Sequence, residues 1–537
     1  MAIMAMATAR KINYSRLANV ISLLSCFTFA SSAMAGEWQF VPSFGIEETY
    51  TDNVELANTD QTSSFVSQAI LALNMDYQSR LANFSFTGEN NNLFYSHDSE
   101  IDDSYLTLDT EGQLYLWNNG PALFATAQVG NSNRNAASNG LADLVSGDTV
   151  QSTSYSTGIL YNVQNNTVNI ASSLDYTISR FEDGIGEYDN ISAFLNTQSG
   201  NNARLAFWQL SSSYSEREQE SLGATRSGKQ YSIDAILGLL TPWKINPFVR
   251  FYDEDISGSF GIQNQPTTSS WGPGLRWLIS QHLLIDVSYN YVTDDTVSDD
   301  YVAASLQWEP SARTSITAGY SQRFFGDSYN LDIKHQTKRL TNTITYDESL
   351  EVFDRSTFER IDLGQFWCPA NTSIDGISDC FAQSTEINSD GYFPQNFFYF
   401  EPIESNEFTL NKSFSWVSTL QLARTSFTFN SSASRRERIE SQIINDTLSA
   451  SLSINRKISG KSNLTLLAKY NYRIFDKDNT DDSGQKDHYR TVSATYTKDL
   501  ASSLSTNFTV QHVNRSSNLE QYTYNELRAI INIKKEF

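Results

Sequence analysis

The chain offers few side chains for acid–base or nucleophilic catalysis. It has five His among 537 residues, and a hydrolytic site needs a His beside a Ser or an acidic partner. His97, which precedes Asp98, and His488, which follows Asp487, come nearest to that pattern. Neighbouring residues of an extended chain point in opposite directions, so neither pair predicts a catalytic site. We expect a protein that is not an enzyme, with no catalytic residues and no cofactor.

Carboxylates are abundant, and hard divalent cations could bind them. They form short clusters: Asp102 and Asp103; Glu182, Asp183, Glu187 and Asp189; Asp253–Asp255; Asp294, Asp295, Asp299 and Asp300; Asp476, Asp478, Asp481 and Asp482. The run from Asp476 to Asp481 resembles the start of a calcium loop but lacks its central Gly and closing Glu. We predict a solvated acidic surface and no metal site; calcium bridging to lipopolysaccharide phosphates is the open alternative.

The charge balance restricts the partners. The chain carries 38 Lys and Arg against 61 Asp and Glu, a formal net charge of −23. Binding to nucleic acid requires clustered Lys and Arg that neutralise phosphates, so no nucleic-acid partner is expected.

The first residues predict export. A basic stretch with Arg10, Lys11 and Arg16 precedes an apolar run, and Ala33-Met34-Ala35 is the small-x-small pattern that signal peptidase accepts. We predict that residues 1–35 are a signal peptide, cleaved between Ala35 and Gly36. Outside the cytoplasm, Cys368 and Cys380 are expected to form a disulfide that closes a short loop.

Beyond residue 36 the apolar period is two. Alternating apolar residues, as in Val168, Ile170, Leu174, Tyr176 and Ile178, face away from Asn, Ser, Asp, Gln and Gly, which is typical of β-strands with one polar face. Many of these runs are longer than strands of soluble sandwiches. In lipid every backbone polar group must be paired within the protein, so such strands can span a membrane only as a closed barrel.

The connections alternate between long and short without a break, as in outer-membrane barrels with short periplasmic turns and long extracellular loops. Short turns include Ser79-Arg80, Asn165-Asn166 and Gly460-Lys461. The pattern predicts one all-β domain over residues 36–537, a transmembrane antiparallel up-and-down β-barrel of about 24 strands (22–26). Pro273 cannot donate to a ladder, so we expect a bulge in its strand.

Aromatic residues support this register. Six of the nine Trp fall near predicted periplasmic strand ends: Trp38, Trp117, Trp243, Trp277, Trp308 and Trp416. Interfacial aromatics mark membrane surfaces. The chain ends in alternating apolar residues up to Phe537, which looks like the C-terminal signal read by the outer-membrane barrel assembly machinery. We therefore expect an integral protein of the bacterial outer membrane, in contact with its lipid and lipopolysaccharide.

The connection at about 348–404 is much longer than the others and carries four consecutive aromatic residues, Phe397, Phe398, Tyr399 and Phe400. Long loops are usually functional or disordered. Two alternatives stay open: the segment packs into the barrel mouth or meets a partner, or the aromatic row extends a strand above the membrane. A lumen of this size would leak solutes unless a segment of the protein narrowed it. We expect segment 348–404 to be the large internal segment that narrows and gates the lumen.

The opening stretch with Pro42-Ser43-Phe44, Glu48-Thr49-Tyr50-Thr51-Asp52-Asn53-Val54 and Leu56, and a central stretch with Gly272-Pro273-Gly274-Leu275-Arg276-Trp277 and Arg323-Phe324-Phe325-Gly326, resemble the outer-membrane β-barrel family associated with PEP-CTERM/exosortase systems. That resemblance implies a role in exopolysaccharide production or export, with exopolysaccharide and its export proteins as partners. It supplies no catalytic residues.

Three functions are compatible with these features. The first is a conduit or scaffold for exopolysaccharide export or surface assembly in an exosortase-type system, in which inward polar side chains bind sugars. The second is a general or substrate-specific porin. The third is a structural or adhesive surface barrel.

Overall fold

The computed structural model describes residues 36–537 except 142, 222–223, 259–266, 294–298, 352–356, 371–376, 378–379, 383–390, 404–406 and 478–483. The predicted signal peptide 1–35, with Ala35 at its predicted cleavage site, lies outside the described residues, as do parts of the acidic clusters near residues 294 and 478.

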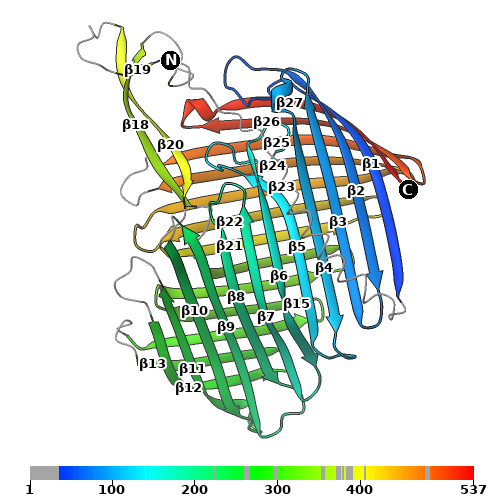
Figure 1. Cartoon of the computed structure of the whole chain (residues 1–537). Helices are drawn as coiled ribbons and strands as arrows, with labels where there is room; N and C mark the ends of the chain where they lie inside the picture. The colour runs from blue at the N-terminus through cyan, green and yellow to red at the C-terminus, as the bar shows by residue number, and fades with distance from the viewer. Residues whose placement is uncertain are drawn as a thin grey trace.

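The described chain is almost entirely β-strand (Figure 1). The strands are β1 (Glu37–Thr51), β2 (Ser64–Gln78), β3 (Ala82–Tyr95), β4 (Asp103–Tyr115), β5 (Ala122–Asn133), β6 (Thr149–Gln164), β7 (Val168–Phe181), β8 (Tyr188–Ser199), β9 (Ala206–Ser221), β10 (Ala224–Leu239), β11 (Ile245–Gly258), β12 (Thr267–Ser280), β13 (Leu283–Val292), β14 (Tyr301–Ser311), β15 (Thr314–Arg323), β16 (Gly326–Gln336), β17 (Leu340–Glu351), β18 (Thr357–Pro369), β19 (Phe381–Ala382), β20 (Tyr392–Ile403), β21 (Thr409–Gln421), β22 (Thr425–Arg438), β23 (Ile444–Ser459), β24 (Ser462–Lys477), β25 (Gln485–Ala501), β26 (Leu504–Ser517) and β27 (Tyr524–Glu536). Two 3-10 turns, η2 (Ser99–Ile101) and η4 (Glu520–Tyr522), lie in loops. In the described part of the chain, no helix is both long enough and apolar enough to cross a membrane.

The strands form a closed ring. Each pairs antiparallel with its neighbour along the chain, β17 pairs with β21, and β1 pairs with β27, with Thr51 opposite Arg528 and Ile46 opposite Ile533. The ring contains 24 strands, which confirms the predicted all-β antiparallel barrel and its strand number. Closure leaves no strand edge unpaired, which is the condition for crossing lipid.

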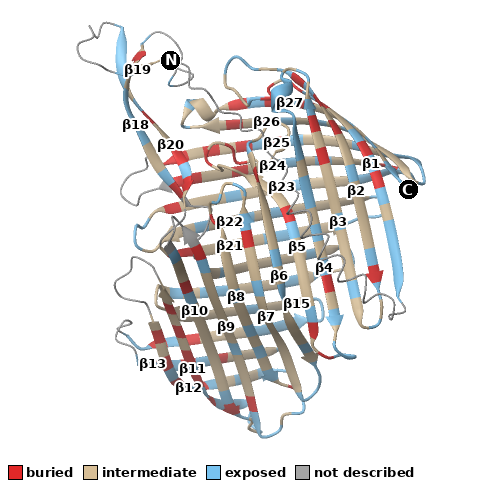
Figure 2. Cartoon of the chain, viewed as in Figure 1, coloured by how far each residue is buried: buried red, intermediate tan, exposed pale blue. Residues whose placement is uncertain are grey.

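Alternation gives the wall two faces. On β10, Leu237 and Leu239 are 64% and 61% exposed, whereas Ser232 and Asp234 of opposite parity point inward, where Asp234 pairs with Arg250. Exposed apolar side chains that belong to a continuous outer face identify a membrane-facing surface. Among the described residues, buried side chains occur in short stretches of the strands and do not form one central core (Figure 2).

The predicted aromatic belt lies at one end of the ring. Trp38, Trp117, Trp243, Trp277, Trp308 and Trp416 are all exposed, and each lies in a short turn or in the strand half next to one. We call this end the short-turn end and the opposite one the long-loop end; in outer-membrane barrels they face the periplasm and the exterior.

The bulge predicted for the strand of Pro273 is present, but not at the proline itself. The β12–β13 register shifts between Leu278 and Ser280, beside the short turn. At Pro273 the β11–β12 register is unbroken, with Val249 opposite the proline. On the other side the β12–β13 pairing passes over Gly272 and Pro273 without a change of register, so the proline interrupts the ladder without an extra residue.

The segment predicted as a loop at about 348–404 is mostly sheet. Strand β17 continues to Glu351, and β18, β19 and β20 form a separate three-stranded sheet that projects from the ring (Figure 1). Cys368 and Cys380 are joined by a disulfide in this projecting sheet, as predicted. Phe397, Phe398, Tyr399 and Phe400 are consecutive residues of β20.

Candidate functional site: a loop inside the barrel mouth

Residues 134–148, which connect β5 to β6, form a loop whose side chains and backbone bind the inward faces of distant strands. We call it the mouth loop. Its base is closed by a backbone hydrogen bond from Arg134 N to Asp148 O (3.0 Å) and by an exposed ion pair between the same two residues (2.9 Å). The described parts of the loop lie between this base and the contacts set out below.

Short polar side chains fold the loop locally. The Asn135 side-chain oxygen accepts from the backbone N–H groups of Ala137 (3.0 Å) and Ser138 (3.3 Å), and Asp143 accepts from Val145 N (2.9 Å). Such Asx turns replace a backbone partner by a side-chain oxygen. The loop can therefore leave the sheet without losing all its backbone hydrogen bonds.

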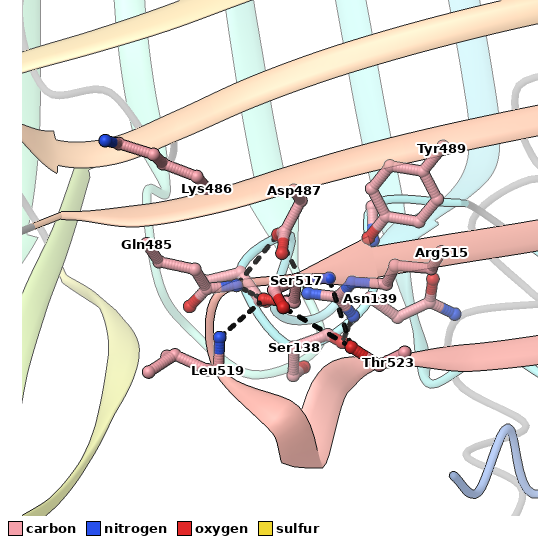
Figure 3. Close-up of polar contacts among 12 residues, drawn as sticks. Ser138, Asn139, Gln485, Lys486, Asp487, Tyr489, Arg515, Ser517, Leu519 and Thr523 are labelled. Atoms are coloured by element: carbon pink, nitrogen blue, oxygen red, sulfur yellow. Dashed lines mark hydrogen bonds and ion pairs between the residues drawn. The ribbon is translucent and has the colours of Figure 1, made fainter.

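A buried ion pair binds the first half of the loop. Arg515 of β26 and Asp487 of β25 lie 2.8 Å apart with side chains 1% and 0% exposed. Arg515 also donates to the carbonyl oxygens of Ala137 (2.8 Å) and Ser138, and Gln485 donates to Ala137 O (2.6 Å) (Figure 3). Two loop carbonyls thus supply acceptors for both terminal nitrogens of a buried guanidinium, whose Nε is buried without a partner.

Gly140 brings the loop backbone against β25. Its N–H donates to the Tyr489 hydroxyl (2.8 Å). A Cβ at this position would lie 2.7 Å from an Arg473 nitrogen and 2.9 Å from that hydroxyl, so a larger residue does not fit without displacement. Leu141 packs beside Gly140 against the cluster of Tyr489, Val513 and Tyr524.

The second half of the loop binds β27. Asp143 forms an ion pair with Arg528, whose Nε also bonds Glu526 (2.7 Å). The Ser146 hydroxyl and the Thr51 hydroxyl of β1 both donate to Glu526, at 2.9 and 2.7 Å. Here the loop supplies one of the carboxylates that neutralise Arg528.

Tyr95 adds a third attachment, from β3. Its hydroxyl lies 3.1 Å from the Leu144 carbonyl oxygen and 3.0 Å from that of Val145. Side chains of β3, β25, β26 and β27 therefore bind one short loop from the inside of the ring.

Tyr522 lies next to Arg515, with its ring 4.9 Å from the guanidinium carbon. Burial raises the pKa of Tyr522, so its hydroxyl stays protonated at neutral pH.

The projecting sheet packs on the same loop. Phe358 and Phe400 are buried against Ala137 and Phe475, and Asn135 donates to the Phe400 carbonyl oxygen (2.5 Å). Both alternatives for the aromatic row hold in part, because the row extends a strand beyond the ring and its last ring packs at the mouth. The expectation that segment 348–404 is the large internal one is corrected: the segment bound to the inward faces is 134–148. A gating role for Phe397 to Phe400 stays a prediction.

A second region of the interior is filled by side chains alone. Arg250 pairs with Asp234 (2.7 Å), Arg276 with Asp286 (2.7 Å), and Arg323 with Glu254. The last pair and the contact from Arg250 to Ser321 (3.4 Å) join β11 to β15, which are four strands apart in the ring. The wall therefore curves sharply here, and this corner leaves little open lumen.

On two stretches of the wall, most inward side chains are hydroxyls and amides, with Asp175 of β7 as a charged exception that accepts from Ser192 (2.7 Å). On β22 and β23 they are Ser426, Thr428, Asn430, Ser432, Ser434, Thr447, Ser449, Ser451 and Ser453; on β6 to β9 they include Ser154, Ser156, Ser173, Thr177, Ser192, Asn196, Gln198, Gln209, Ser211, Ser213 and Ser215. A wall of this kind binds mainly through hydrogen bonds.

The two ends differ in charge. Exposed basic residues lie in or beside most short turns: Arg80, Arg204, Lys244, Arg313, Lys338, Arg339, Arg424, Lys457 and Lys461. Carboxylates lie near the long-loop end, where outward Tyr hydroxyls donate to them, as from Tyr176 to Asp189 and from Tyr231 to Asp253 (both 2.9 Å). The predicted acidic surface is therefore at the long-loop end.

The candidate histidines do not form an acid–base site with the acids beside them in the sequence. His97 Nδ1 lies 2.8 Å from the Ser64 hydroxyl, and His488 Nδ1 lies 2.9 Å from the Tyr470 hydroxyl. Ser64 is 2% exposed, so it is shielded from a substrate. Across the described residues, His, Cys, Asp and Glu form no group of three or more that could hold a metal ion.

Sequence reasoning missed the mouth loop. Its residues resemble an ordinary polar connection, and Arg515, Asp487 and Arg528 are three of many polar residues at inward positions. A usable signal was the charge of Arg515 and Asp487 on one inward face, since a barrel side chain of that kind needs a partner.

The geometry defines a class: a transmembrane β-barrel of the outer-membrane type with a loop bound inside its mouth. No protein-family model matches the chain, and no curated protein matches it. The ferric enterobactin receptor of Pseudomonas aeruginosa is 10% identical over 93% of this chain and 80% of that chain, with a TM-score of 0.43. The siderophore receptor PirA of Acinetobacter baumannii is 10% identical over 93% of this chain and 80% of that chain, with a TM-score of 0.42. The FrpB iron transporter of Neisseria meningitidis is 8% identical over 92% of this chain and 81% of that chain, with a TM-score of 0.42. These distant likenesses carry no function to this chain, and its fold class rests on its own ring of strands.

Proposed function

We propose that this protein is an outer-membrane conduit for exopolysaccharide, working with the export proteins of an exosortase-type system. The observation that carries the proposal is the lumen wall of β6 to β9, β22 and β23, where Ser, Thr, Asn and Gln predominate. Sugar hydroxyls both donate and accept hydrogen bonds, and these side chains offer both capacities. The resemblance of the opening and central stretches to the PEP-CTERM-associated barrel family supports the same role.

The mouth loop suits a conduit that must not leak. A ring of this size leaves an aqueous lumen unless something narrows it, and the loop is bound inside the mouth from several sides. In this proposal the loop limits passage of small solutes and yields to a polymer that arrives from the short-turn end.

The test is secretion of polysaccharide by cells that lack the protein. Cell-free polysaccharide in the medium should fall several-fold in the deletion strain and return when the gene is restored. Unchanged secretion, with the barrel verified as absent from the outer membrane, would refute the conduit role.

A porin is the second candidate, favoured by the fixed nature of the loop contacts. The buried pair of Arg515 and Asp487 holds the first half of the loop as a static constriction, which sets a size limit for solutes. A porin would conduct small solutes constitutively and leave polysaccharide secretion unchanged. A structural or adhesive barrel is a third candidate, supported by the disulfide-closed sheet that projects beyond the ring.

A further inference from the structure

The lumen wall of β6 to β9 contains a groove near the short-turn end. The groove has a cavity volume of about 550 Å³ and is lined by two rows of inward side chains with a third row between them. The middle row, which includes Val163 and Ile170, points to the lipid side because successive strand residues alternate. Its backbone therefore forms the floor, and the two inward rows form the walls.

One wall is a row of four amides in direct register. Gln164 lies opposite Asn169, Asn169 opposite Gln198, and Gln198 opposite Gln209. Neighbouring strands are about 4.8 Å apart, so the row extends for about 14 Å across the wall. Asn162 and Asn196 belong to the other wall. The groove therefore has amides on both sides, over a length that matches a short oligosaccharide.

These amides have hydrogen-bonding capacity that the protein does not use. Among the described residues, none of their side chains has a hydrogen-bond partner, and the Asn169 Oδ1 is buried without one. Some inward amides elsewhere are paired, as Asn91 with Glu89 (2.8 Å) and Asn455 with Thr465 (3.0 Å). Others, such as Gln219 and Asn507, have amide atoms that are buried without a partner, so it is the alignment in one row that distinguishes the groove. Asn162, Gln164, Asn196 and Gln198 are exposed to the lumen. Their amide groups are therefore accessible to a ligand that supplies both donors and acceptors.

The surroundings identify the chemistry of that ligand. No charged side chain lines the groove, so it offers no counter-ion to a uronate, sulfate or phosphate. The next inward row contains Phe194, which is 42% exposed and faces the lumen beside Ser173 and Ser213. A phenyl face beside a row of amides suits the apolar face and the hydroxyl edge of a sugar ring.

We propose that this amide groove is a binding subsite for an uncharged glycan at the short-turn entrance of the lumen. The inference deepens the proposed conduit function, on which it rests, by naming the substrate class as neutral sugar chains. The groove holds a segment of the chain against the wall by several weak hydrogen bonds, which permits sliding.

The test uses the purified full-length barrel in detergent and two probes, a neutral glucose hexamer and a galacturonate hexamer. Saturation-transfer NMR titrations give the affinity for each. We expect the neutral hexamer to bind and the galacturonate hexamer to bind much more weakly. Loss of two amides in Gln164→Leu/Gln198→Leu should weaken neutral binding by about tenfold, the effect of two modest hydrogen bonds.

Controls separate binding from folding. Gln128→Leu changes an inward amide on β5, opposite Ser154 and outside the groove, and should leave affinity unchanged. Gln164→Ser/Gln198→Ser keeps the wall polar and should weaken binding as the Leu pair does; heat-modifiable gel migration verifies folding of each variant. Equal affinity in wild type and both groove variants, or tighter binding of galacturonate, would overturn the inference. If the groove variants bind the neutral hexamer as wild type does while secretion depends on the protein, the conduit function is supported and the groove is not its binding site. If the groove binds the hexamer while secretion is unchanged in the deletion strain, the conduit function is refuted and a porin for sugars is supported.

Discussion

Arg515 and Asp487 face each other at 2.8 Å inside the ring, with side chains 1% and 0% exposed, and the guanidinium also donates to two carbonyl oxygens of the mouth loop. The pair lies on neighbouring strands, whereas the loop it binds is more than 300 residues earlier in the chain. A side-chain pair of the wall thus determines where a distant loop lies.

Arg515→Ala should release the first half of the loop and destabilise the mouth. Removing one partner of a buried pair leaves the other charge uncompensated, at a cost of about 3–5 kcal/mol. We expect limited proteolysis within 136–141 to become fast while the strand content by circular dichroism is unchanged. Arg435→Ala is the matched control, because it removes one partner of an exposed pair with Asp446 and should leave proteolysis at the wild-type rate. A protected loop in Arg515→Ala would show that the pair does not hold it.

The second attachment is expected to act independently of the first. Asp143→Asn removes the charge that the loop contributes to Arg528, and Glu526 still compensates that cation. Proteolysis should therefore increase around 143–147 and less than in Arg515→Ala. If Asp143→Asn increased the rate of proteolysis equally in both halves of the loop, the loop would be one cooperative unit.

Gly140→Val tests the close approach of the loop to β25. The added side chain would collide with Arg473 and Tyr489 and prevent the hydrogen bond from the residue-140 N–H to the Tyr489 hydroxyl. We expect the same loop release as for Arg515→Ala without any change of charge. Gly460→Val, at a short turn where a Cβ would meet nothing within 4 Å, is the control and should behave as wild type.

The strand architecture was predictable because it is encoded in local alternation. Val168, Ile170 and Leu174 reveal their lipid face by parity, and short turns such as Asn165-Asn166 reveal which end they occupy. The Trp belt followed from position in that register, and the pairing of Cys368 with Cys380 followed from the predicted export of the chain and their short spacing.

The mouth loop could not be found in this way. Its anchors Arg515, Arg528 and Tyr95 are polar residues on a polar face, so alternation gives them no distinct pattern. Segment 348–404 was instead expected to enter the lumen because it is long and aromatic. Much of that length forms β18 and β20, whose mutual hydrogen bonds let the segment stand outside the ring.

Loss of the disulfide should leave the mouth unaffected. Cys368→Ser/Cys380→Ser removes a closure at the far part of the projecting sheet, whereas Phe358 and Phe400 pack at its base. We expect faster proteolysis of residues 366–392 in the variant and wild-type protection of 134–148. Release of the mouth loop in this variant would mean that the projecting sheet holds the loop closed.

Single-channel conductance in planar bilayers tests the central claim, that the mouth loop narrows the lumen. Wild type, a deletion of residues 136–146, and a deletion of the projecting sheet over residues 357–403 would be compared. We predict small or no currents for wild type and for the sheet deletion, and large stable currents for the loop deletion. Equal conductance in wild type and the loop deletion would contradict the account, and large currents after the sheet deletion alone would transfer the gating role to Phe397 to Phe400.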